Sequence, residues 1–200
     1  MLPSFLLGLK RLTMSEVQTS QPWLERIASW RFLAVLIVLY GIVFTFLMRG
    51  MGGAPGDNQP LDLMFSYSPE QVYANLAQLG EAGRKTRILV SSTLDTAYPL
   101  VYSTLFAVLI TLLTRFLRLT HKVWKWLALL PFVILAFDLS ENLSINVMAF
   151  LYPQTLTALA QAASLFTSVK WIFVGLVLVS LAVLALLSVF RLLRRQGRGA

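Results

Sequence analysis

The 200-residue chain has no cysteine and a single histidine, His121. Without cysteine it forms no disulfide, no thiolate metal site and no cysteine nucleophile, and cysteine usage cannot indicate a redox compartment. One histidine also excludes a histidine-rich metal or haem site. Charged residues are scarce as well, at 13% against roughly a quarter in soluble proteins. We therefore expect no metal, no cofactor and no soluble globular fold.

What the chain has in abundance is apolar sequence, since 57% of its residues are hydrophobic. Four apolar stretches each approach the ~20 residues that a helix needs to cross about 30 Å of hydrocarbon. The expected spans are residues 30–49, 89–114, 124–150 and 168–190. The sequence therefore predicts an all-α fold, a four-helix transmembrane bundle within a membrane domain of residues 30–190.

Lysine and arginine gather on one side of these spans. Of the 17 basic residues, 12 lie in or directly beside the N-terminal segment (1–29, with Arg31 just after it), the second loop or the basic tail (191–200), where only two acids oppose them. The positive-inside rule then places both termini in the cytoplasm of a plasma or inner membrane. Because these basic residues adjoin the spans, they account for the net charge of +8, and we expect no nucleic-acid partner.

The N-terminal segment has no small-residue cleavage site after its short apolar piece, so we expect no secretory signal in residues 1–28. Apolar residues recur at helical spacing from Trp23 to Trp30, with Pro22 in the expected first turn. This pattern indicates a short helix at the cytoplasmic interface. A simple aromatic anchor for the first span is the alternative.

The first outer loop, residues 50–88, carries the signals of an amphipathic helix. Ser68 is the expected N-cap, Pro69 the first helical residue, Gln71 the partner in a capping box and Gly80 the stop. The apolar residues of this helix share one face: Val72, Leu76 and Leu79, with Tyr73 beside them. We expect it to lie across the outer mouth of the bundle like a lid, with a second short helical cap in residues 152–168.

The second span contains the unusual stretch LDTAYP, which includes Asp95 and Pro99. Helical spacing places Asp95, Tyr98 and Tyr102 on one face. Proline has no N–H, so Pro99 frees the carbonyl of Asp95, and in lipid that carbonyl needs another donor. Pro99 is expected to kink its span, as is Pro131 in the next span.

The third span supplies a matching polar stripe. Asp138, Glu141 and Asn142 lie at positions i, i+3 and i+4 of one helix face. A rise of 1.5 Å per residue places Tyr102 and Asp138 at about the same height. The count therefore pairs Tyr102 with Asp138, and Tyr98 with Glu141 or Asn142.

Ionisable groups in a membrane interior cost several kcal/mol and mark a partner, a cavity or a functional site. The predicted pocket residues are Asp95, Tyr98, Tyr102, Asp138, Glu141, Asn142 and Lys170. The leading hypothesis is an outer-leaflet pocket between spans two and three that binds a small amphiphile, a lipid headgroup or a cation. One alternative is a lipid-modifying or isomerising enzyme that uses paired carboxylates. The other is purely structural, with the acids neutralised by Lys170, Arg49, Arg84 or Arg87 as glue between helices.

No activated nucleophile accompanies these groups, so the hypothesis leans away from an enzyme and names no catalytic residue. Membrane lipids are the expected partners. Small residues in the fourth span, such as Gly175, Ser180 and Ala185, would allow close contact between two copies in a homo-oligomer.

The stretches LDLMFSYSPEQVYANLAQLGEAGR, LDTAYPLVYS and FDLSEN, between about residues 60 and 150, resemble an uncharacterised family of small four-span integral membrane proteins. That resemblance implies the four-span fold and no activity. The chain is also loosely similar to sterol-isomerase and sigma-2-receptor-like four-span proteins, which place acids in a bundle cavity. It departs from them by lacking their histidines.

Overall fold

The computed structural model describes residues 22–51 and 61–196, and predictions for the remaining residues lie outside the described part. The elements are α2 (Pro22–Ile27), α3 (Trp30–Met51), the 3-10 turn η2 (Leu61–Leu63), α4 (Pro69–Leu117), α5 (Lys122–Leu127), α6 (Leu130–Leu151) and α7 (Thr157–Gln196). No strand is present in these two ranges. Four of the helical segments are long and apolar enough to cross a membrane. The all-α bundle is therefore confirmed, and the chain is a multi-pass membrane protein.

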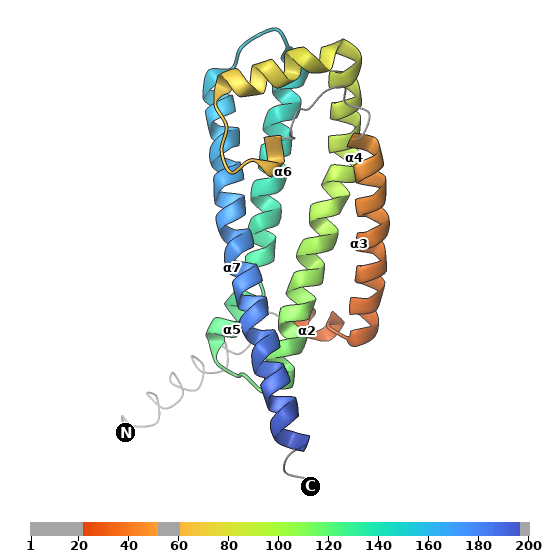
Figure 1. Cartoon of the computed structure of the whole chain (residues 1–200), viewed down its shortest axis with the longest axis vertical. Coiled ribbons are helices and arrows are strands. Elements are labelled where there is room, and N and C mark those ends of the chain that lie inside the picture. The colour runs from red at the N-terminus through yellow and green to blue at the C-terminus, as the bar shows by residue number, and fades with distance from the viewer. Residues whose placement is uncertain (1–21, 52–60, 197–200) are drawn as a thin grey trace, which may run out of the picture.

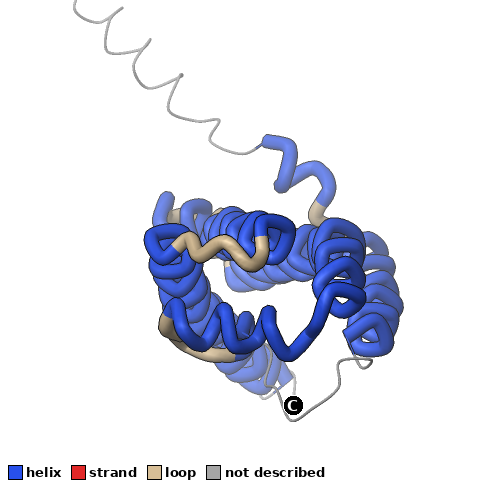
Figure 2. The backbone as a smooth tube through the Cα atoms, turned by 90° about the horizontal axis from the view of Figure 1, so that it is seen from above, coloured by secondary structure: helices blue, strands red, loops and turns tan. Residues whose placement is uncertain are grey.

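Helix α4 is the central element of the bundle. It packs against α3, α6 and α7, and α6 packs along α7 (Figures 1 and 2). The short helices α2 and α5 lie at one end of the bundle (Figure 1). We call this the basic end, because it carries Arg115, Arg118, Lys122 and Lys125. We call the opposite end the capped end, because the first part of α4 crosses it (Figure 1).

The bundle exposes large apolar side chains and buries a set of polar ones among apolar neighbours. Large apolar side chains are exposed along α3 and α7, for example Val35, Val38, Val179 and Leu186. Buried polar side chains include Ser91, Ser103, Asp138, Glu141, Asn142 and Lys170. This is the distribution expected where lipid surrounds the helices and polar groups must find partners within the protein.

The first part of α4, residues 69–79, forms the predicted amphipathic helix, which we call the lid helix. Its capping box is present, because Ser68 N–H donates to Gln71 Oε1 at 2.7 Å and Gln71 N–H donates to Ser68 Oγ at 3.3 Å. Val72 and Leu76 are fully buried. They pack against the ends of α6 and α7 in an apolar lid cluster whose buried members are Leu61, Tyr67, Val72, Leu76, Ile145, Met148, Ala149, Ala160 and Ala163.

Gly80 turns the chain from the lid helix into the spanning part of α4. Its φ of 63° and ψ of −178° are non-helical, in a region that essentially only glycine adopts. The stop predicted at Gly80 is thus correct in that the helix changes direction at this residue. Helical hydrogen bonding resumes directly afterwards, so residues 81–88 are helical rather than loop.

Replacing Gly80 with alanine is expected to lower the free energy of unfolding by about 1–3 kcal/mol, because alanine is strained at this φ. Gly175→Ala in α7 is the matched control, since an added Cβ meets no atom within 4 Å at either position. Alanine in a helix interior is favourable over glycine, so the control should not lose stability. Thermal unfolding in detergent micelles measures both. Equal stability of the two variants would contradict the strain argument.

Two expectations for the later helices need correction. Residues 157–167 are the first turns of α7 and not a separate cap, because the alanine-rich segment after Pro153 contains no further helix breaker. The third apolar stretch is two helices, with a break at residues 128–129. Pro131 is the second residue of α6. In a continuous helix its ring would clash with the carbonyl of the residue four positions earlier. That residue is Leu127, where α5 ends.

Candidate functional site

Polar residues meet between two apolar clusters of the bundle. The lid cluster lies toward the capped end, and the second cluster includes Val108 of α4, Ile134 of α6 and Val177 of α7. On α6, Asp138 and Glu141 lie between these two sets of apolar residues. We call the polar region the polar layer. Its members are Asp62, Tyr67, Arg87, Asp95, Tyr102, Asp138, Glu141, Asn142, Thr167 and Lys170.

Lys170 of α7 is the centre of the polar layer. Only 6% of the residue is exposed. Its Nζ donates to Asp138 Oδ1 at 3.2 Å and to Glu141 Oε2 at 2.7 Å. It also lies 3.4 Å from the backbone carbonyl of Asp62. One ammonium group therefore joins two carboxylates of α6 and the η2 turn.

Two tyrosines complete the coordination of these carboxylates. Tyr102 OH donates to Asp138 Oδ2 at 2.7 Å, which is the pairing predicted by counting helical rise. Tyr67 OH donates to Glu141 Oε1 at 3.3 Å, and Thr167 Oγ1 lies 3.1 Å from the same hydroxyl. Burial, followed by the negative charge of Glu141, raises the pKa of Tyr67. The hydroxyl therefore keeps its proton and remains a donor to Glu141.

The carbonyl freed by Pro99 has a donor across the helix interface. α4 continues through Pro99, and Asn142 Nδ2 donates to the Asp95 carbonyl at 3.5 Å. The Asp95 carboxylate has no hydrogen bond within the described ranges. Four charged groups lie close enough to act on it electrostatically: Asp62, Asp138, Arg87 and Lys170.

The predicted contact of Tyr98 with Glu141 or Asn142 is wrong. Tyr98 OH instead lies 3.0 Å from Tyr40 OH of α3, and the two rings are 5.4 Å apart. Tyr98 is four residues from Tyr102, so it is rotated about 40° around the helix axis. That rotation turns it toward α3, the neighbour of α4 on that side.

The cations considered as neutralising groups have different positions. Arg84 donates to the Leu76 carbonyl at 3.0 Å and lies over the Tyr152 ring at 4.0 Å, so it fastens the lid helix. Arg49 is exposed at the end of α3. Lys170 and Arg87 are the cations that act on the polar layer.

Three residues of the layer were not predicted: Asp62, Tyr67 and Thr167. Asp62 and Tyr67 lie in the irregular segment before the lid helix, where no periodic pattern reveals which way a side chain points. Thr167 lies three residues before Lys170 and so shares its helix face. A helix predicted to begin at residue 157 rather than 168 would have included it.

Several buried polar atoms in and around the layer have no hydrogen-bond partner within the described ranges. Three are amide or carboxylate oxygens, namely Asp62 Oδ1, Asn142 Oδ1 and Asn146 Oδ1. Arg87 Nε is also without a partner. The layer holds four carboxylates (Asp62, Asp95, Asp138 and Glu141) against two cations, so it is acceptor-rich and the acids outnumber the cations in the formal charge count. In the same ranges no group of three or more His, Cys, Asp and Glu side chains could hold a metal ion.

Comparison of the chain with protein-family models, with curated proteins and with solved structures finds no match. The resemblance to a four-span family therefore stays a prediction.

Proposed function

We propose that this multi-pass membrane protein binds the ammonium group of a small amphiphile in the polar layer. The observation that carries the proposal is the imbalance of four carboxylates against Lys170 and Arg87 around buried acceptor oxygens without partners. A cation with N–H donors supplies both the missing charge and the missing hydrogen bonds. An anion is disfavoured by the same excess.

The apolar surroundings favour an amphiphile over a hydrated inorganic ion. The polar layer lies between two apolar clusters, where a small ion would lose its hydration shell at high cost. An alkyl chain attached to the ammonium group instead gains from contact with apolar side chains. A lipid with an amine headgroup has the same chemistry.

The distribution of basic residues supports an orientation of the bundle in the membrane. The basic end carries the arginines and lysines that flank the spans, and the positive-inside rule assigns such loops to the cytoplasm. We therefore propose that both termini are cytoplasmic. The polar layer then lies in the outer half of the membrane, beneath the lid helix.

The geometry favours binding over acid–base catalysis. Lys170 engages Asp138 and Glu141 together, and each carboxylate also receives a tyrosine hydroxyl. Neither carboxylate is left poised to exchange a proton with a substrate. Among the described residues Asp95 has no such partners, so it is the group that we assign to the ligand's charge.

The proposal is tested by thermal unfolding of the purified protein with octylammonium chloride, using octanol and sodium chloride as controls. A ligand at 100 times its Kd adds about 2.7 kcal/mol of stability, or roughly 5–10 °C for a chain of this size. Protection by octylammonium alone is expected, and Asp95→Asn should abolish it while leaving the fold intact.

If octylammonium does not protect the wild type, the polar layer serves only as glue between helices. If octanol protects equally, apolar contact and not charge is responsible. Native mass spectrometry with phosphatidylethanolamine and phosphatidylglycerol then shows whether a lipid amine is retained in preference to a lipid without one.

A further inference from the structure

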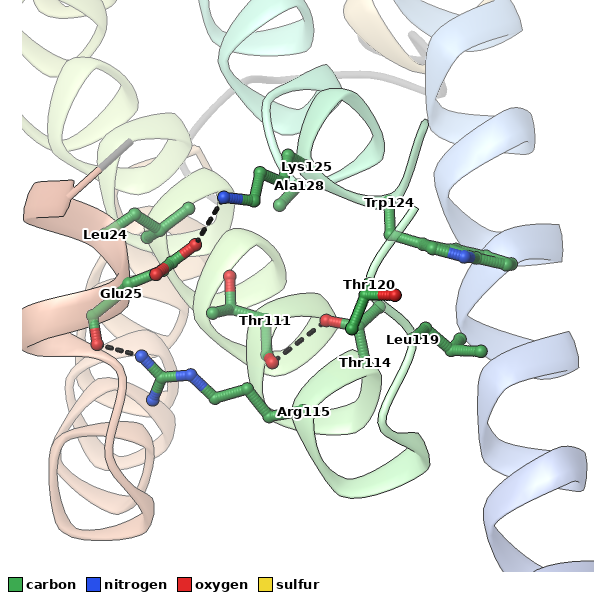
Figure 3. A pocket seen from close by; sticks show the side chains of 10 residues that line it. All are labelled: Leu24, Glu25, Thr111, Thr114, Arg115, Leu119, Thr120, Trp124, Lys125 and Ala128. Carbon is green, nitrogen blue, oxygen red and sulfur yellow. Dashed lines mark hydrogen bonds and ion pairs between the residues drawn. The ribbon is translucent and has the colours of Figure 1, made fainter. Parts of the chain in front are cut away.

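A cavity of about 280 Å³ lies at the basic end (Figure 3). It is separate from the polar layer, because Thr111 in its wall follows Tyr102 by nine residues of α4, or about 14 Å. It is an open-sided pocket between α2, the last turns of α4 and α5. The side chains important for its chemistry are Glu25, Thr111, Thr114, Arg115, Trp124 and Lys125. Pockets for small molecules span about 300–1,000 Å³. This volume therefore suits a headgroup or a small ester better than a whole lipid.

The cavity lies at the level where the spans begin and end. Trp30 opens α3 two residues after Ala28, and Arg115 lies two residues before the end of α4. Trp126 of α5 is 65% exposed and Trp23 of α2 is 47% exposed. Tryptophan side chains of this kind concentrate at the membrane–water boundary. The cavity is thus at the depth of lipid phosphates.

Arg115 brings a positive charge whose hydrogen bonds go to backbone carbonyls. Its guanidinium donates to the Ala28 carbonyl at 3.0 Å. It also donates to the Glu25 carbonyl (Figure 3). Within residues 22–51 and 61–196, no carboxylate lies within salt-bridge distance of it. Carbonyl contacts hold the side chain in place but leave its charge available to an anion.

Lys125 brings a second positive charge whose carboxylate partner is exchangeable. Its Nζ lies 3.2 Å from Glu25 Oε1, and the two side chains are 38% and 47% exposed. Ion pairs this exposed contribute little net free energy. A phosphate oxygen can therefore replace the Glu25 carboxylate as the partner of Lys125 at small cost.

Two threonines of α4 provide hydrogen-bond acceptors on the same side of the cavity as Arg115. Thr111 Oγ1 donates to the Ala107 carbonyl at 2.8 Å, and Thr114 Oγ1 donates to the Ile110 carbonyl at 2.9 Å. Each hydroxyl proton is used inside the helix, which leaves oxygen lone pairs for a donor. A hydroxylated headgroup next to a phosphate has that donor.

We infer that this cavity binds a phosphate ester that carries a hydroxylated group, with Arg115 and Lys125 on the phosphate and the threonine oxygens on the hydroxyl. A glycerophospholipid of the surrounding membrane and a soluble sugar or glycerol phosphate share this chemistry. The position at the membrane–water boundary favours the lipid.

The test measures affinity for dihexanoyl-phosphatidylglycerol by titration of the purified protein in a non-ionic detergent. Lys125→Gln is expected to weaken binding about fivefold, the effect of one lysine near an anionic lipid. Lys125→Arg keeps the charge and should retain affinity. Glu25→Gln removes the competing carboxylate and should strengthen binding. Lys85→Gln is the matched control, because Lys85 also pairs with a glutamate, Glu81 at 2.6 Å, but at the capped end.

The opposite signs separate binding from structure. Lys125→Gln and Glu25→Gln break the same ion pair, so a purely structural role moves the affinity in one direction for both variants. That result overturns the site, as does an equal loss in Lys85→Gln or no binding to the wild type.

Titration with glycerol 3-phosphate and with dihexanoyl-phosphatidylcholine identifies the source of the phosphate ester. Equal binding of glycerol 3-phosphate supports the phosphate site and assigns it to a soluble ester, whereas equal binding of the choline lipid overturns the role of the hydroxylated group.

Discussion

Replacing Lys170 with methionine is expected to lower the free energy of unfolding by about 3–5 kcal/mol, the largest effect of any substitution considered. The side chain is almost completely buried and its Nζ is the shared partner of Asp138 and Glu141. Without it, two adjacent carboxylates must hold unpaired charge or take up protons, and both outcomes cost free energy. Thermal unfolding in dodecylmaltoside micelles should show a decrease of roughly 6–20 °C.

A compensated variant provides the control for this prediction. Lys170→Met combined with Asp138→Asn and Glu141→Gln removes the unpaired charges together with the ammonium group, and should recover most of the lost stability. Lys85→Gln disrupts an exposed ion pair and should leave the transition unchanged. A Lys170→Met variant as stable as the wild type would show that Lys170 does not neutralise the buried carboxylates.

The second large effect is expected at the lid helix, where Leu76→Ala should cost about 2–5 kcal/mol. Leu76 is fully buried in the lid cluster, so truncation leaves a cavity against α6 and α7. Gln78→Ala on the exposed face of the same helix is the control and should change stability by less than about 0.5 kcal/mol.

Hydrogen exchange distinguishes where the Leu76→Ala variant is weakened. Faster exchange confined to residues 69–79 is expected, because the lid helix loses contacts while the spans keep theirs. Faster exchange throughout α6 and α7 would mean that the lid cluster stabilises the whole bundle. No change in exchange or in unfolding would show that the packing of Leu76 is unimportant.

The spans could be predicted because lipid imposes a length and a composition on them, whatever their neighbours are. Their ends were harder to predict. Residues 157–167 were predicted as a separate short helix, but they are the first turns of α7, in which Ala160 and Ala163 are buried members of the lid cluster. Such a tertiary contact is not visible in the local sequence.

Most of the polar layer could be predicted for a related reason. Counting helical rise gives depth, and depth is enough to match Tyr102 with Asp138. Depth does not give the rotation of a helix about its own axis relative to a third helix. That rotation decides that Tyr98 of α4 meets Tyr40 of α3. Asp62 reaches the layer from a turn without periodicity, so no count could place it.

Gly80 also determines the shape of the capped end. The lid helix is an arm of roughly 16 Å, given 1.5 Å per residue, and it joins the spanning part of α4 through this single non-helical residue. Its far end is held next to Ser68, where Tyr67 N–H donates to Ser164 Oγ at 2.9 Å. One helix therefore supplies both a wall of the bundle and the roof over it, and a single glycine sets the angle between the two (Figure 1).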